Sequence, residues 1–109
     1  MSACIVYMTA ADVEEAERIG RMLVEGRLAA CVNVLGPIQA IFHWDGAVQT
    51  AGEVAFIAKT WDDRLAELTS AVRKAHSYDV PCIVALPLTG GDAAFLDWIR
   101  DRTRPVMLA

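Results

Sequence analysis

The sequence predicts an α+β fold in which one antiparallel sheet carries helices on one face. Apolar runs typical of strands alternate with amphipathic segments in the order β-α-β-β-α-β, and a further helical segment follows. The chain has 109 residues and is 55% hydrophobic, which supplies one core but not two. Two split β-α-β units of this kind form a ferredoxin-like sheet. We therefore expect a single domain over residues 1–109.

The first strand and helix follow from residues 3–26. Residues 3–9 form a short apolar run and predict a strand buried on both faces. Asp12 and Glu15 then have the spacing of a capping box, in which each side chain accepts from backbone N–H groups at a helix start. Apolar residues at helical spacing continue to Gly26, which is suited to ending a helix.

A long hairpin is predicted between residues 29 and 60. Gly36-Pro37 interrupts its first arm and predicts a bulge or bend, and Asp45-Gly46 predicts the turn. Each arm has about 15 residues, well beyond the usual ~5–6. The hairpin must therefore project past the core. Because its tip is apolar, we expect it to pack on another subunit; the tip residues are Ile41, Phe42, Trp44 and Val48.

The second half repeats the pattern. Asp62 or Asp63 is positioned to cap a helix that ends near His76. Residues 82–86 are wholly apolar and predict another strand. Asp92 is positioned to cap a C-terminal helix that ends before Pro105 and turns its apolar side chains inward; these are Phe95, Leu96 and Ile99.

Composition and motifs exclude several functions. A net charge of -4 argues against nucleic-acid binding, and no apolar run reaches the ~18 residues that a membrane span needs. No nucleophile–base motif is present, so we do not expect an enzyme. Three cysteines form no CxxC pair, and no basic leader precedes the first strand, which predicts reduced thiols and a cytoplasmic location. Cys4 and Cys82 lie on strands that we expect to be neighbours in the sheet.

Six short motifs, in order and at matching spacing, together resemble the CutA family of divalent-cation-tolerance proteins. The resemblance covers nearly the whole chain, and its motifs are Thr9-Ala10-Ala11-Asp12, Leu28-Ala29-Ala30-Cys31-Val32-Asn33, Trp44-Asp45-Gly46, Lys59-Thr60, His76-Ser77-Tyr78-Asp79-Val80-Pro81, and Leu86-Pro87 leading into Leu96-Asp97-Trp98. This similarity implies a cytoplasmic homotrimer with ferredoxin-like subunits, assembled like the PII signalling proteins. It also implies tolerance of divalent metals and copper binding.

The resemblance places copper ligands at positions that correspond to Met8 and His76, and Cys31 is a further candidate. Sulfur and imidazole donors favour copper in its reduced form, with zinc as a second choice. Each residue also has a structural interpretation. Cys31 and Met8 suit an apolar core, and His76 suits the C-terminus of a helix.

Four more residues are candidates for a ligand site: Lys59, Glu53, Trp44 and Tyr78. A lysine with a carboxylate and aromatic groups in a cleft between subunits would hold a small anion. The alternative is that Lys59 ends a strand and pairs with an acid at the surface. Two functions remain open: a trimeric metal-binding protein, or a PII-like sensor or scaffold that binds a small ligand or a protein partner.

Overall fold

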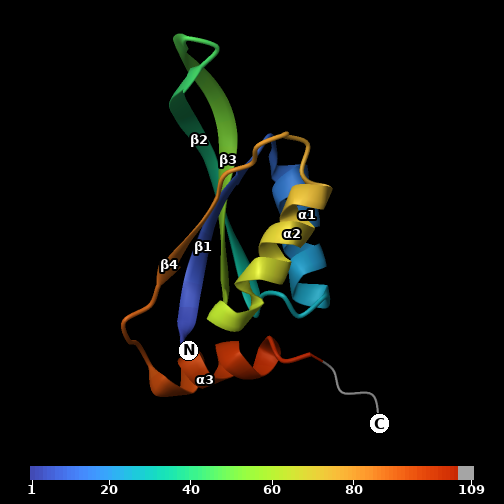
Figure 1. The fold of residues 1–109 in the computed structure, drawn as a ribbon, viewed down its shortest axis with the longest axis vertical. Coiled ribbons are helices and arrows are strands. Elements are labelled where there is room, and N and C mark those ends of the chain that lie inside the picture. The colour runs from blue at the N-terminus through green and yellow to red at the C-terminus, as the bar shows by residue number, and fades with distance from the viewer. Residues whose placement is uncertain (106–109) are drawn as a thin grey trace.

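The computed structural model describes residues 1–105 and arranges them as four strands and three helices (Figure 1). A short 3-10 turn, η1, precedes the second helix. In chain order the elements are β1 (Ala3–Ala10), α1 (Val13–Glu25), β2 (Cys31–Trp44), β3 (Ala47–Trp61), η1 (Asp62–Arg64), α2 (Leu65–Ala75), β4 (Ile83–Pro87) and α3 (Ala93–Arg102).

The four strands form one antiparallel sheet in the order β2-β3-β1-β4, which confirms the predicted ferredoxin-like fold. Helices α1 and α2 lie side by side on one face, and α3 crosses the end of the sheet where β1 begins (Figure 1). Across residues 1–105, no helix is both long and apolar enough to span a membrane.

The core lies between the sheet and helices α1 and α2. Alternate residues of β1 and β3 point into it, and the largest side chains there are fully buried: Val6, Met8, Phe56, Ile19, Leu23, Leu68 and Val72. This one-sided packing follows from the amphipathic helices, whose apolar faces cover one side of the sheet.

The opposite side of the sheet, which we call the open face, has no helical layer. Paired residues in neighbouring strands share a face, and the register assigns to the open face Ile5, Tyr7, Cys31, Asn33, Ile57, Lys59, Val84 and Leu86. The prediction that β1 is buried on both faces is wrong, because Ile5 and Tyr7 stay half-exposed on this side.

The predicted hairpin is confirmed. β1 pairs with β3 over residues 54–61, so the rest of β3 pairs with β2 alone and projects beyond the core (Figure 1). A register shift between Val34 and Gly36 marks the expected bulge. Asp45 and Gly46 have φ angles of 51° and 73°, as a tight hairpin turn requires.

The helix starts are partly as predicted. Asp12 accepts from the Glu15 backbone N–H at 2.8 Å, and Asp92 caps α3 in the same way. The prediction that Asp62 or Asp63 caps α2 is wrong, because both carboxylates serve long-range contacts. Asp62 accepts from the Ser2 backbone N–H, and Asp63 pairs with Arg104 at 2.6 and 2.7 Å.

Cys4 and Cys82 do not meet, although β1 and β4 are neighbours as expected. Cys4 is opposite Pro87, whereas Met8 is opposite Ile83. The antiparallel register therefore puts the two thiols at opposite ends of the pair of strands, and the structure records both as free cysteines.

Helix α1 packs closely on β2 at Gly20. A Cβ atom at this position would lie 2.9 Å from Val32 Cγ1. We expect Gly20→Ala to destabilise the fold by about 1–2 kcal/mol, because overpacking outweighs the gain in helix propensity. Urea unfolding measures the change.

The matched background is Val32→Ala, which removes the opposing methyl groups. In that background the same Gly20→Ala change should be neutral or stabilising. A Gly20→Ala protein as stable as the parent would show that the α1–β2 contact can relax.

Candidate functional site

His76 lies at the end of α2, where the segment 76–82 crosses the ends of α1 and β1. Its side chain is fully buried. The Tyr78 backbone N–H donates to His76 Nδ1 at 3.1 Å, so the ring proton belongs on Nε2, which donates to the Thr9 carbonyl at 2.8 Å. Both ring nitrogens therefore hydrogen-bond to backbone groups. The buried His76 side chain thus links β1 to the segment that follows α2.

Glu15 is the centre of the same cluster and is only 7% exposed. Its carboxylate accepts from the Ala11 N–H and from the N–H and hydroxyl of Ser77, at 2.9–3.0 Å. Burial alone raises the pKa of Glu15, but these hydrogen bonds and the nearby His76 outweigh it, so the pKa is lowered. The Asp12–Glu15 spacing predicted the capping role. It carried no signal for the contact with Ser77, 62 residues away.

The cluster contains a serine, a histidine and a glutamate, yet they are not arranged for nucleophilic catalysis. Ser77 Oγ donates to Glu15 rather than to His76, and His76 Nδ1 lies 3.9 Å from the Glu15 carboxylate. An activated serine needs a direct hydrogen bond to its base. The cluster is therefore built to hold the 76–78 segment in place.

Tyr78 connects this segment to the base of the hairpin. Its hydroxyl donates to Glu53 Oε2 at 3.0 Å, and its ring packs on that of His76. Burial, followed by the bond to Glu53, raises the pKa of Tyr78 to about 12. Two of the four predicted ligand-site residues thus meet. Trp44 lies apart from them, 55% exposed beside the hairpin turn.

Lys59 is also separate from Glu53, because six residues along β3 span ~20 Å. Lys59 Nζ donates to Asn33 Oδ1 at 2.7 Å and lies 5.7 Å from the centre of the Phe95 ring. Phe95 was expected to face inward but is 43% exposed. Within residues 1–105 no carboxylate lies within 4 Å of Lys59, so it does not form the surface ion pair that was the alternative interpretation.

The three candidate copper ligands lie in different places. Met8 is fully buried on the helix side of the sheet, Cys31 is half-buried on the open face opposite Lys59, and His76 is occupied as described. In the part of the chain that the structure describes, no three His, Cys, Asp or Glu side chains are close enough to hold a metal ion. The three residues do not fit a copper ion as one set within a subunit.

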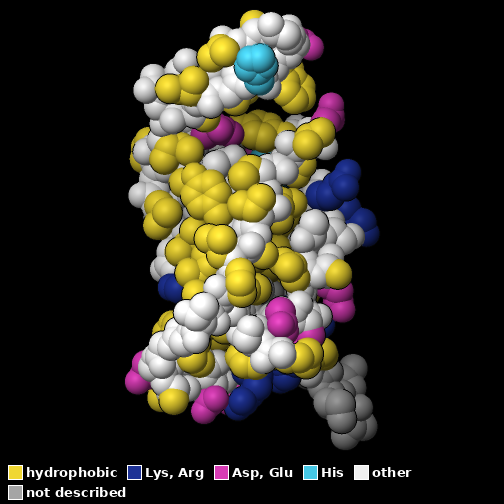
Figure 2. All heavy atoms as spheres, turned by 60° about the vertical axis from the view of Figure 1, so that its left-hand side comes forward, with side chains coloured by type: hydrophobic (Ala, Val, Ile, Leu, Met, Phe, Trp, Pro, Cys, Tyr) yellow, Lys and Arg dark blue, Asp and Glu magenta, His cyan; other side chains and the backbone are white. Residues whose placement is uncertain are grey.

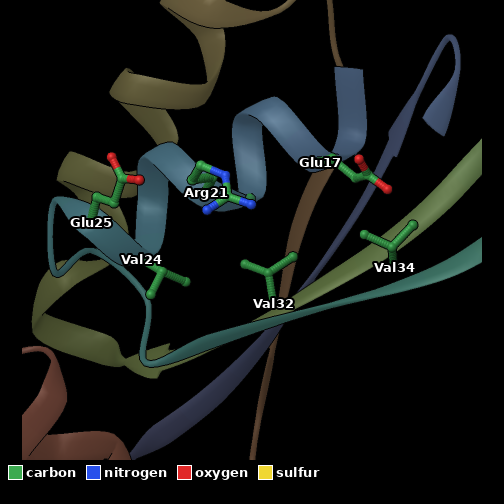
Figure 3. Close-up of a pocket in the computed structure, with 7 residues that line it drawn as sticks. Glu17, Arg21, Val24, Glu25, Val32 and Val34 are labelled. Atoms are coloured by element: carbon green, nitrogen blue, oxygen red, sulfur yellow. The ribbon is translucent and has the colours of Figure 1, made fainter. Parts of the chain in front are cut away.

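Two surface hollows lie near α1, and none of the seven predicted site residues lines them. One, of about 290 Å³, runs between α1 and β2. Figure 3 shows its apolar floor, where Val24 and Val32 point toward one another, and its charged rim on α1. The other, of about 410 Å³, surrounds the acidic start of α1 beside Ser77.

Comparisons of the sequence with known proteins all find the same family. The family described as CutA1 divalent ion tolerance protein matches residues 4–102. The chain is 48% identical over 96 residues to the divalent-cation tolerance protein CutA of Archaeoglobus fulgidus, covering 88% of this chain and 93% of that one. It is 39% identical over 100 residues to the chloroplastic protein CutA 1 of Oryza sativa, covering 92% of this chain but 56% of that one.

The fold agrees with these matches. A solved structure, described as the periplasmic divalent cation tolerance protein CutA from Archaeoglobus fulgidus, superposes with a TM-score of 0.91. The two chains are 44% identical in that alignment, which covers 94% of this chain and 99% of the other.

The predicted cytoplasmic location is wrong, since this similar structure is described as periplasmic. The prediction took unpaired cysteines as a sign of a reducing compartment. Burial raises the pKa of all three thiols, at Cys4, Cys31 and Cys82, which lowers the tendency of each to oxidise. Such thiols persist without a disulfide partner and do not report on the compartment.

The lowered pKa of Glu15 makes a prediction for acid stability. A carboxyl group whose pKa is depressed by folding stabilises the protein above its unfolded pKa, and the contribution is lost as the pH falls through the folded value. We expect Glu15→Gln to lose about 1–3 kcal/mol at pH 7 and progressively less below pH ~4. Denaturant unfolding at a series of pH values measures both effects.

The control is Glu14→Gln, an exposed carboxylate in the same helical turn, which should change stability little at any pH. If Glu15→Gln lost the same stability at pH 3 as at pH 7, the ionised form of Glu15 would not be the stabilising one.

Proposed function

Because the chain belongs to the CutA1 divalent ion tolerance family, we propose that it serves divalent-cation tolerance as a homotrimer assembled through the open face of its sheet. The observation that carries this proposal is the open face itself, an apolar surface that a single subunit leaves in water. The family relationship supports the link to divalent cations.

The open face is too apolar for a surface that remains in solvent. Leu86 and Val84 are 60% and 54% exposed, and Ile5, Tyr7 and Ile57 lie between them and β2. Figure 2 views this side and shows a broad hydrophobic area across the middle of the molecule, with charged groups mostly at its margins. Contiguous patches of this kind mark protein interfaces.

The hairpin supports the same conclusion. Beyond residue 54 toward the turn, its two arms pair only with each other, and an isolated two-stranded hairpin is marginally stable in water. Its exposed side chains are nevertheless large and apolar, as at Ile41, Trp44 and Val48. Packing against neighbouring subunits would bury them and hold the arms in place.

The two edge strands of the sheet are compatible with a closed trimer. β2 and β4 are the two outer strands, and they differ in length and sequence. Contact between two unlike surfaces of the same chain builds a ring rather than a twofold dimer. A three-membered ring with inward-facing sheets matches the PII-like assembly that the family resemblance implies.

We propose a binding and assembly function, with no catalysed reaction. The groups best suited to acid–base chemistry support this, since His76 and Glu15 are both committed to backbone hydrogen bonds. Tyr78 and Glu53, which were predicted as ligand contacts, hold the 76–82 segment against β3 and thereby shape the face on which subunits meet.

We propose more specifically that the protein binds copper and that Cys31 is one of the ligands. This is the candidate sulfur on the open face, whereas Met8 faces the core. Donors from more than one subunit would be required, because residues 1–105 of one subunit do not assemble a set of His, Cys, Asp or Glu ligands. Burial raises the pKa of the Cys31 thiol and the charge of Lys59 offsets only part of that rise, so copper would have to displace the thiol proton on binding.

The trimer makes a direct prediction for two substitutions. Leu86→Lys places a charge on the open face, and Trp44→Ala removes a large side chain from the hairpin. Both should shift the protein from trimer to monomer by at least tenfold in dissociation constant, with the secondary structure of the subunit retained. Light scattering across a dilution series and circular dichroism measure the two properties.

Val13→Lys is the control, because Val13 is 40% exposed on α1, away from the open face. It should remain trimeric. A wild-type protein that is monomeric at micromolar concentration, or a Leu86→Lys trimer of unchanged stability, would contradict the proposal.

Copper binding is tested by anaerobic titration of the reduced protein with Cu(I) against a competing chelator. Cys31→Ser should weaken copper binding at least tenfold, while Cys82→Ser, another half-buried thiol, should not. Equal binding by the parent and Cys31→Ser would remove Cys31 from the site.

A further inference from the structure

We propose that Lys59 and Asn33 form a binding site for a small oxyanion, a carboxylate or a phosphate, at the subunit interface. The inference rests on the proposed trimer, which would bury the open face around these residues. It departs from the sequence-based expectation, in which Lys59 shared a site with Glu53, Trp44 and Tyr78.

Lys59 is a cation on an otherwise apolar part of the sheet. The register places Ile5 and Cys31 beside it on the flanking strands, and the Phe95 ring lies 5.7 Å away. Within residues 1–105 its one hydrogen bond to another side chain goes to Asn33 Oδ1 at 2.7 Å. An ammonium group has three donors, so two remain for a ligand.

Burial would make this arrangement costly without an anion. Removing a charged group from water costs several kcal/mol unless it is paired and hydrogen-bonded. In residues 1–105 every carboxylate is more than 4 Å from Lys59 Nζ, and Asn33 contributes a neutral oxygen. A Lys59 buried in the trimer would therefore need a negatively charged partner.

The hairpin of a neighbouring subunit is poorly equipped to supply that charge. Between residues 31 and 52, which include the projecting arms, Asp45 at the turn is the one acidic residue. Glu53, at the base of the hairpin, already accepts from the Tyr78 hydroxyl. An anion from solution is the better source of that charge.

The two polar residues also define the chemistry of the ligand. Because Asn33 Oδ1 accepts from Lys59, and its amide N–H₂ makes no hydrogen bond among residues 1–105, Asn33 offers a second kind of donor beside the ammonium. A positive charge next to an amide donor suits an oxyanion, which can accept from both through different oxygens. The apolar groups around them would exclude water and strengthen the contact.

Titration calorimetry of the intact protein tests the site, with inorganic phosphate and succinate as separate probes at low salt. The variants are Lys59→Met, which keeps the chain length without the charge, and Lys59→Arg, which keeps the charge. Lys74→Met is the matched control, because Lys74 is the other lysine of the chain and is exposed on α2. Light scattering on each sample reports the oligomeric state.

We expect one anion per subunit for the wild type, and at least a tenfold loss of affinity in Lys59→Met. Lys59→Arg should retain binding, and Lys74→Met should match the wild type.

A trimer that binds neither probe, or binds either one equally well after Lys59→Met, overturns the anion site. If the wild type is a trimer that binds no anion and Lys59→Met dissociates, a neighbour's carboxylate is the partner and the inference is also wrong. A monomeric wild type would instead contradict the trimer, so the two failures are distinguishable.

Discussion

One-sided coverage of the sheet is the constraint on which the rest of the structure depends. Helices α1 and α2 cover one face, and residues between the two layers such as Val6, Phe56 and Leu23 have no exposed surface. The other face carries side chains that are nearly as apolar but have no covering layer. Because burial of apolar area contributes roughly 25 cal/mol per Å², this face provides a strong drive to associate. The hairpin, which is stabilised within one subunit only by its own pairing, extends the same surface.

The polar cluster of Glu15, His76 and Ser77 holds the segment that joins α2 to β4. The segment after α2 must return to the sheet edge as β4, and its backbone groups need hydrogen-bond partners on the way. A buried carboxylate and a buried imidazole satisfy the backbone groups of that segment. Such a network is specific because each missing partner would leave a buried polar atom without a hydrogen bond. It therefore fixes the position of β4 and, through Tyr78 and Glu53, the base of the hairpin.

In the proposed trimer, charge on the open face would link assembly to ligand binding. An apolar surface associates without discrimination, whereas a cation within it imposes a requirement for a partner of opposite charge. Lys59 has that position, between Cys31 and Ile5 on the flanking strands. The proposed copper contact and the proposed anion site thus share one small region of the interface. Both would be completed only on assembly, so ligand binding and trimer stability are expected to be thermodynamically linked.

The sequence by itself determined the order of elements, the hairpin with its turn and bulge, and the caps at Asp12 and Asp92, because these depend on residues close together in the chain. It also grouped Tyr78 and Glu53 with Lys59 and Trp44, of which the structure brings only Tyr78 and Glu53 together. Tertiary structure decided how polar side chains are used. Asp63 pairs with Arg104 rather than capping α2, Glu15 binds Ser77, and Lys59 binds Asn33. The physical reason is that hydrogen bonds and ion pairs go to whichever groups folding brings within 3 Å, and residue spacing carries no record of that choice.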